Sequence, residues 1–180
     1  GGVSVLGVQV LEEMARLGMI LDVSHLSDAG FWDVIDLFEG PIIASHSSCR
    51  ALCATPRNLS DDQIRALADR GGVIGINFSP SFVKKGGRAT VEDVAAHVLH
   101  VVEVAGIDHV GYGSDFDGIS STPEGLEDVT KLPCLTAKLL EAGLNEKEIR
   151  KIIGGNFLRI INMCGKPVSG SAKTEDQDKC

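Results

Sequence analysis

Three short apolar segments of this 180-residue chain end in residues that can bind a metal or move a proton. His25 ends ILDVSH, His46 ends IIASH, and Asp115 ends VGYGSD. Imidazole nitrogens and carboxylate oxygens are ligands for zinc and similar divalent ions, and both groups also act as general acids and bases. Because these residues are far apart in the sequence, only the fold can gather them. The pattern predicts a metal or acid–base site and leaves the individual roles open.

Two further features have ordinary and functional interpretations. Arg57, in ATPRNLSDDQ, follows the second apolar segment. It is either a surface guanidinium or a clamp on a substrate carboxylate, which a planar guanidinium fits well. His97 and His100 lie three residues apart in a helical pattern that lacks the acid of an H-E-x-x-H zinc site, so we interpret them as ordinary helix residues.

The elements that must position these residues alternate along the chain. Apolar strands are expected in MILDVSH, PIIASHSS, GVIGINFSP and DHVGYGSDFDG, with amphipathic helices between them. Helix starts are indicated at Ser27, Ser60, Thr90 and Asn145. Strands that alternate with helices predict an α/β fold with buried parallel strands, either a doubly wound sheet or a (β/α)8 barrel. Four such units make about half of a barrel, which typically takes about 250 residues.

Composition narrows the class of protein. The formal net charge of -8 and the scattered basic residues argue against nucleic acid as a partner. No apolar run approaches the roughly 20 residues of a membrane helix. Five cysteines without a C-x-x-C pair predict reduced thiols and no disulfide framework. Residues 1–163 are expected to form the α/β part, and the polar residues 164–180 a disordered tail. The sequence favours a protein that is soluble over this span, with a lean toward the cytoplasm.

Several motifs together resemble a known family. These are LGMILDVSH, IIASHSS with Arg57 and Asn58 eleven and twelve residues after His46, and GSDFDG followed by TPEGLEDVTKLP. They resemble the membrane (renal-type) dipeptidases and their bacterial relatives, which form peptidase family M19 among the metal-dependent amidohydrolase-like barrels. The resemblance extends from about Gly2 to Met163.

The resemblance implies a (β/α)8 TIM-type barrel with a binuclear Zn2+ site that hydrolyses dipeptides. It implies that His25 and His46 bind one zinc ion and that Arg57 holds the terminal carboxylate of the dipeptide. Asp115 would be catalytic and face the substrate: it would orient or deprotonate the attacking water and pass the proton to the leaving amine. Homodimers are common in the family, so a homodimer is also expected.

The chain lacks some features of the family pattern. The family carries an H-x-D motif on its first strand and a bridging Glu on a later one, and this sequence has no H-x-D. We therefore expect this chain to be the C-terminal half of the barrel, which needs the N-terminal half for its remaining ligands. No lipid-anchor signal follows the last helix. Two alternatives stay open: a related amidohydrolase that acts on a non-peptide amide, and a non-catalytic truncated paralogue.

Overall fold

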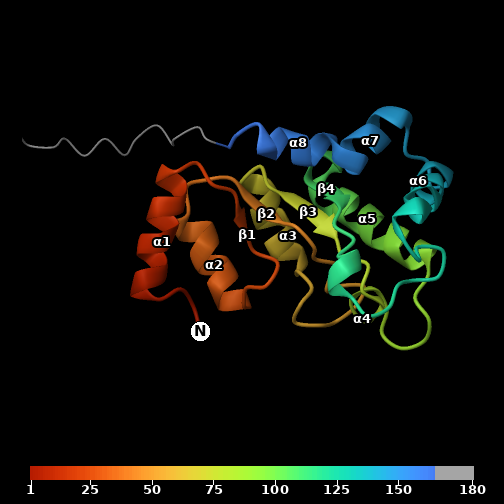
Figure 1. Ribbon diagram of the computed structural model, residues 1–180, viewed down its shortest axis with the longest axis horizontal. Helices are drawn as coiled ribbons and strands as arrows, with labels where there is room; N and C mark the ends of the chain where they lie inside the picture. Colours follow the sequence, from red (N-terminus) through yellow and green to blue (C-terminus); the bar gives the residue numbers. More distant parts are fainter. Residues whose placement is uncertain (165–180) are drawn as a thin grey trace, which may run out of the picture.

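The computed structural model describes residues 1–164, and its centre is a sheet of four parallel strands. The strands are β1 (Leu21–Asp22), β2 (Ile42–Ala44), β3 (Val73–Ile76) and β4 (Val110–Tyr112). They lie in the order β1-β2-β3-β4, so each strand pairs with the next one in the sequence. Figure 1 shows this sheet with α1 and α2 beside its first strand and α6 beyond its last. The α/β fold with four strand–helix units is confirmed.

Helices connect the strands and cover the sheet. The α-helices are α1 (Val5–Arg16), α2 (Asp28–Leu37), α3 (Asp61–Asp69), α4 (Pro80–Val83), α5 (Val91–Ala105), α6 (Leu132–Glu141), α7 (Glu146–Arg150) and α8 (Asn156–Ile161). Short 3₁₀ turns lie at η1 (Ile107–His109), η2 (Phe116–Gly118) and η3 (Val129–Lys131), and η4 (Lys151–Gly155) is a π-helical segment. No helix among residues 1–164 has the length and apolar character needed to cross a bilayer.

Side-chain caps start the connecting helices where the sequence predicts them. The hydroxyls of Ser27, Ser60 and Thr90 each accept a hydrogen bond from a backbone N–H in the first turn, as does the side-chain oxygen of Asn145. Such a cap satisfies a donor that has no partner within the helix and contributes about 1 kcal/mol. The caps at Ser27 and Ser60 end the loops that follow β1 and β2, and these loops carry His25, His46 and Arg57.

Two predicted elements differ from the structure. The strands are shorter than the apolar runs, since β1 contains only Leu21 and Asp22, and His25 lies in the loop that follows. The helix whose start is predicted at Asn145 is interrupted by η4, with non-helical backbone at Gly154. The Gly154–Gly155 pair accounts for this break because glycine is a poor helix former.

The core fills the space between the sheet and its helices. Its largest fully buried side chains include Phe31, Phe38, Ile64, Ile74 and Leu135. Burial of each such side chain contributes roughly 1.5–3 kcal/mol. Where β3 lies beside the end of β2, a Cβ on Gly75 would collide with the carbonyl oxygen of Ser45. Backbone therefore packs against backbone directly beneath the loop that carries His46.

The remaining sequence expectations have mixed outcomes. Among the described residues, Cys49, Cys53, Cys134 and Cys164 are free thiols, as expected. The boundary at residue 163 stays a prediction. Apart from Cys164, the tail expected to be disordered lies outside the described residues.

Candidate active site

The imidazole rings of His25 and His46 meet at the carboxyl ends of β1 and β2. Their Nε2 atoms lie 2.9 Å apart, and the ring centroids lie 4.9 Å apart. The two residues come together because β1 and β2 are adjacent and parallel, so the loops that leave them start at the same edge of the sheet. Two nitrogens that bind one zinc ion can lie no more than about 4.2 Å apart, because each Zn–N bond is about 2.0–2.1 Å. The His pair meets this condition.

A hydrogen-bond network assigns the proton of His46. Its Nδ1 lies 2.7 Å from the Oγ of Ser45. The Ser45 hydroxyl has one proton, and it donates that proton to a carboxylate oxygen of Asp22. Ser45 must therefore accept from Nδ1–H of His46, so in the neutral imidazole the free lone pair is on Nε2. An unprotonated Nε2 with its Nδ1–H bound to a supporting group is the usual form of a metal-binding histidine.

Asp22 anchors this network from the end of β1. Its carboxylate also accepts hydrogen bonds from the backbone N–H of Ser45, at 2.9 Å, and from the hydroxyl of Ser24, at 2.8 Å. Partial burial raises the pKa of Asp22, but the hydrogen bonds from Ser45 and Ser24 outweigh burial and hold the pKa below its usual value. Asp22 is therefore an ionised acceptor at neutral pH. Ser24 in turn accepts from the backbone N–H of His46 at 3.0 Å.

Arg57 reaches the His pair from the loop after β2. One terminal nitrogen of its guanidinium lies 3.3 Å from Nε2 of His25. The guanidinium carbon lies 5.5 Å from the centroid of the Phe82 ring, within cation–π range. Arg57 is only partly buried, so its guanidinium is accessible to a bound anion. Of the two interpretations drawn from the sequence, this position favours the carboxylate clamp over an isolated surface charge.

Asp115 follows β4 and has left-handed backbone geometry, with φ of 65°. Its carboxylate accepts a hydrogen bond of 3.0 Å from the side-chain amide of Asn77. Asn77 is fully buried, and its own amide oxygen accepts from the backbone N–H of Ser79. This second bond points the NH2 group of Asn77 toward Asp115. Asp115 also lines an open pocket of about 690 Å³, formed by residues 114–118, Thr122 and residues 127–129.

The residue pattern left open whether Asp115 binds a metal. Within residues 1–164, no three His, Cys, Asp or Glu side chains are grouped so that they could hold a metal ion. The individual roles of His25, His46 and Asp115 stay predictions. His97 and His100 are ordinary helix residues, as expected: His97 bonds to Cys49 and Val83, and His100 bonds to Asp61.

Sequence reasoning missed the residues that support the site. Asp22 is the charged residue of an otherwise apolar run, and Asn77 ends the strand that had no assigned site residue. Both were visible as polar groups at strand ends, but their partners come from a neighbouring strand. That pairing depends on strand order, which the sequence leaves open.

Comparison with known proteins identifies the family of this chain. The family model for membrane dipeptidases, peptidase family M19, matches residues 1–172. An uncharacterized dipeptidase from Schizosaccharomyces pombe is 44% identical over 162 residues, which are 88% of this chain and 39% of that protein. The dipeptidase tcpJ from Claviceps purpurea is 43% identical over 161 residues, covering 89% of this chain and 38% of the relative.

A solved structure shows the same arrangement of elements. It is a metallopeptidase from Rhodobacter sphaeroides, liganded with a phosphinate mimic of the dipeptide L-Ala-D-Ala. It superposes with a TM-score of 0.85 at 36% identity, over 91% of this chain and 47% of that one. The chain thus spans less than half the length of each of these three relatives. By its match over residues 1–172, the chain belongs to the membrane dipeptidase family, peptidase family M19.

Proposed function

We propose that this chain supplies part of the active site of a zinc-dependent dipeptidase. The observation that carries the proposal is the convergence of three side chains: Nε2 of His46 lies 2.9 Å from Nε2 of His25, and the Arg57 guanidinium lies 3.3 Å from the same His25 nitrogen. A pair of metal-binding imidazoles beside a fixed cation suits a substrate whose scissile amide is close to a free carboxylate. A dipeptide is the smallest peptide with that arrangement.

His25 and His46 would hold one zinc ion through their Nε2 atoms. The donor set fits, because both nitrogens converge and the Asp22–Ser45 network selects the tautomer of His46 in which Nε2 has the free lone pair. Zinc in such a site polarises the scissile carbonyl and lowers the pKa of water. Two imidazoles are fewer than the three protein ligands of a usual catalytic zinc site. The remaining ligands, and those of a second zinc ion, would come from protein outside residues 1–164, as the expected N-terminal half of the barrel would provide.

Arg57 would bind and orient the substrate. Its guanidinium matches a carboxylate with two parallel hydrogen bonds, which fix direction as well as distance. With the carboxylate held next to His25, the amide one residue away would lie beside the imidazole pair. A tripeptide bound by the same carboxylate would place its C-terminal amide in the same position. The clamp would therefore select a scissile amide next to a free carboxylate, and it would not set the length of the peptide by itself.

Asp115 would move the proton. Its carboxylate accepts a hydrogen bond from Asn77 on one oxygen, which leaves the other oxygen to accept from water. In the reaction it would take a proton from the attacking water and deliver the proton to the nitrogen of the leaving amine. General acid–base catalysis of this kind contributes about 10²–10⁴-fold in rate.

The proposal is tested by substrate profiling of the full-length protein that contains this chain. The substrates are L-Ala-D-Ala, its C-terminal amide, a tripeptide and N-acetyl-D-alanine. We expect turnover of the dipeptide with loss of efficiency for the amide, which offers no carboxylate to Arg57, and the tripeptide reports whether the complete site also limits length. Preference for N-acetyl-D-alanine over L-Ala-D-Ala would instead support the amidohydrolase alternative. A full-length protein that binds no zinc and turns over none of these compounds would support the non-catalytic paralogue. The homodimer stays a prediction.

A further inference from the structure

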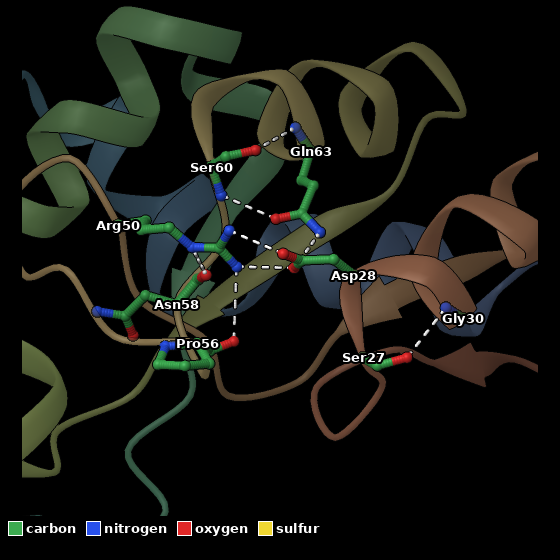
Figure 2. Close-up of polar contacts among 8 residues, drawn as sticks. All are labelled: Ser27, Asp28, Gly30, Arg50, Pro56, Asn58, Ser60 and Gln63. Carbon is green, nitrogen blue, oxygen red and sulfur yellow. Dashed lines mark hydrogen bonds and ion pairs between the residues drawn. The ribbon is translucent and has the colours of Figure 1, made fainter. Parts of the chain in front are cut away.

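The loop that carries Arg57 is held from behind by a second arginine, Arg50. Figure 2 shows the Arg50 guanidinium at the centre of a set of polar contacts that joins this loop to α2 and α3. Its Nε donates to the carbonyl oxygen of Asn58 at 2.9 Å, and a terminal nitrogen lies 3.5 Å from the carbonyl oxygen of Pro56. Pro56 and Asn58 flank Arg57 on either side. Arg50 therefore contacts the backbone immediately before and after the proposed clamp.

Asp28 fixes Arg50 in this position. The carboxylate of Asp28, at the first turn of α2, accepts two hydrogen bonds from the Arg50 guanidinium, at 3.0 Å and 2.7 Å. A bidentate pair of this kind fixes the plane of the guanidinium as well as its distance. The pairing with Arg50 holds the pKa of Asp28 below its usual range, so the carboxylate stays ionised at neutral pH. Because Asp28 neutralises its charge, Arg50 fixes the position of the loop and adds little positive charge to the site.

Two more contacts lock the same assembly to the fold. Gln63 donates to Asp28 at 3.1 Å while its amide oxygen accepts from the backbone N–H of Ser60, which completes the capping box of α3. The buried side-chain amide of Asn58 donates to the carbonyl oxygens of Cys53, at 2.9 Å, and Phe82, at 2.7 Å. The backbone around Arg57 is thus tied to α2, α3 and α4. Its side chain alone extends to the His pair.

We propose that Arg50, held by Asp28, is a positioning residue that fixes where Arg57 binds the substrate carboxylate. The inference rests on the proposed function, and it assigns a role to residues that touch neither the substrate nor the imidazole pair. Loss of the guanidinium frees the carbonyls of Pro56 and Asn58, so the Arg57 loop samples more than one position. The affinity of Arg57 for the substrate carboxylate then falls, while the imidazole pair and Asp115 are unaffected.

The test compares L-Ala-D-Ala with its C-terminal amide as substrates of the full-length protein. For Arg50→Gln we expect KM for L-Ala-D-Ala to rise about tenfold or more, since a hydrogen bond to a charged group is at stake, with kcat changed by less than about twofold. For the amide, which offers no carboxylate to Arg57, both parameters stay within about twofold of wild type. Arg50→Lys keeps the charge but cannot bind Asp28 and both carbonyls together. We therefore expect its KM for L-Ala-D-Ala to lie between those of wild type and Arg50→Gln.

Two controls separate positioning from simple destabilisation. Arg65→Gln removes another guanidinium–carboxylate pair, with Asp62 on α3, that has no contact with the Arg57 loop, and we expect wild-type kinetics. In an Arg57→Gln background, Arg50→Gln adds no further rise in KM, because the two residues act on one contact. Thermal unfolding of each variant reports the folded fraction.

The outcomes are distinct. Equal losses for the dipeptide and the amide in Arg50→Gln, or additive losses with Arg57→Gln, would overturn the positioning role and leave the proposed function standing. If Arg57→Gln itself kept the preference of the protein for the free carboxylate, the clamp would be wrong and this inference would fall with it.

Discussion

The Nε2 atoms of His25 and His46 lie 2.9 Å apart at the ends of neighbouring parallel strands. Between them, α2 carries the chain back to the amino ends of the strands, and β2 returns it to the edge where His25 lies. The Asp22–Ser45 network then directs the lone pair of His46 toward His25. Strand order brings the two rings together, and the hydrogen bonds to Ser45 select the tautomer of His46 in which Nε2 can bind a metal.

Ser45 is expected to affect zinc affinity without contacting zinc. Ser45→Ala removes the acceptor for Nδ1–H of His46, so the ring loses its fixed orientation. Loss of a supporting group of this kind typically costs about 10–100-fold in metal affinity. Competition between the full-length protein and a chelator for zinc measures the change. Ser79→Ala, at the same edge of the sheet but bonded to Ser81, serves as the control and should leave the affinity unchanged.

Asp115 is expected to affect turnover alone. Asp115→Asn keeps the size of the side chain but removes the proton acceptor, and we expect kcat for L-Ala-D-Ala to fall by about 10²–10⁴-fold with zinc content unchanged. Asp117→Asn changes a neighbouring exposed carboxylate in the same pocket and should have little effect. Similar losses in the two variants would show that the charge of the pocket matters and not the position of Asp115.

His97 is expected to make stability depend on pH. Its Nδ1 accepts from the backbone N–H of Cys49 at 3.0 Å, and its Nε2 lies 2.9 Å from the carbonyl oxygen of Val83, so the ring is bound in its neutral form. Burial lowers the pKa of His97 below its ordinary value, although the bond to Val83 acts in the opposite direction. The unfolded chain therefore binds more protons below about pH 6.5.

The free energy of unfolding should fall as the pH drops from about 6.5 through the lower pKa of folded His97. One proton changes the slope of the free energy of unfolding against pH by at most about 1.4 kcal/mol per pH unit. Chemical denaturation between about pH 5.5 and 7.5 measures it, with zinc removed so that metal release does not contribute. His97→Gln should flatten the slope, whereas His109→Gln, whose ring bonds to the backbone of Gly72, should keep it. A slope identical in wild type and His97→Gln would refute the assignment.

Much of the fold follows from local patterns in the sequence. Apolar runs between capped helices predict the four parallel strands, and the caps at Ser27, Ser60, Thr90 and Asn145 are confirmed. His25 and His46 could be identified because the carboxyl ends of parallel strands meet at one edge. Strand ends were less predictable: β1 is only Leu21 and Asp22, because pairing with β2 sets its length and periodicity does not.

The contacts that tune the site could not be predicted in the same way. Ser45 matters because its hydroxyl lies between Asp22 and His46, and the sequence does not show which serine after a strand has that place. Arg50 reads as an ordinary loop residue until Asp28, 22 residues away, is found beside it. Such contacts depend on side-chain positions between neighbouring strand–helix units, and local patterns carry no information about them.

The most direct test of the central claim is the zinc content of the full-length protein, measured together with hydrolysis of L-Ala-D-Ala, for wild type, His25→Ala and His46→Ala. His100→Gln, a histidine change on α5, is the matched control. We predict bound zinc and turnover in wild type and control, with less zinc and turnover reduced by at least about 100-fold in the other two variants. Unchanged zinc content and turnover in both His25→Ala and His46→Ala would contradict the account.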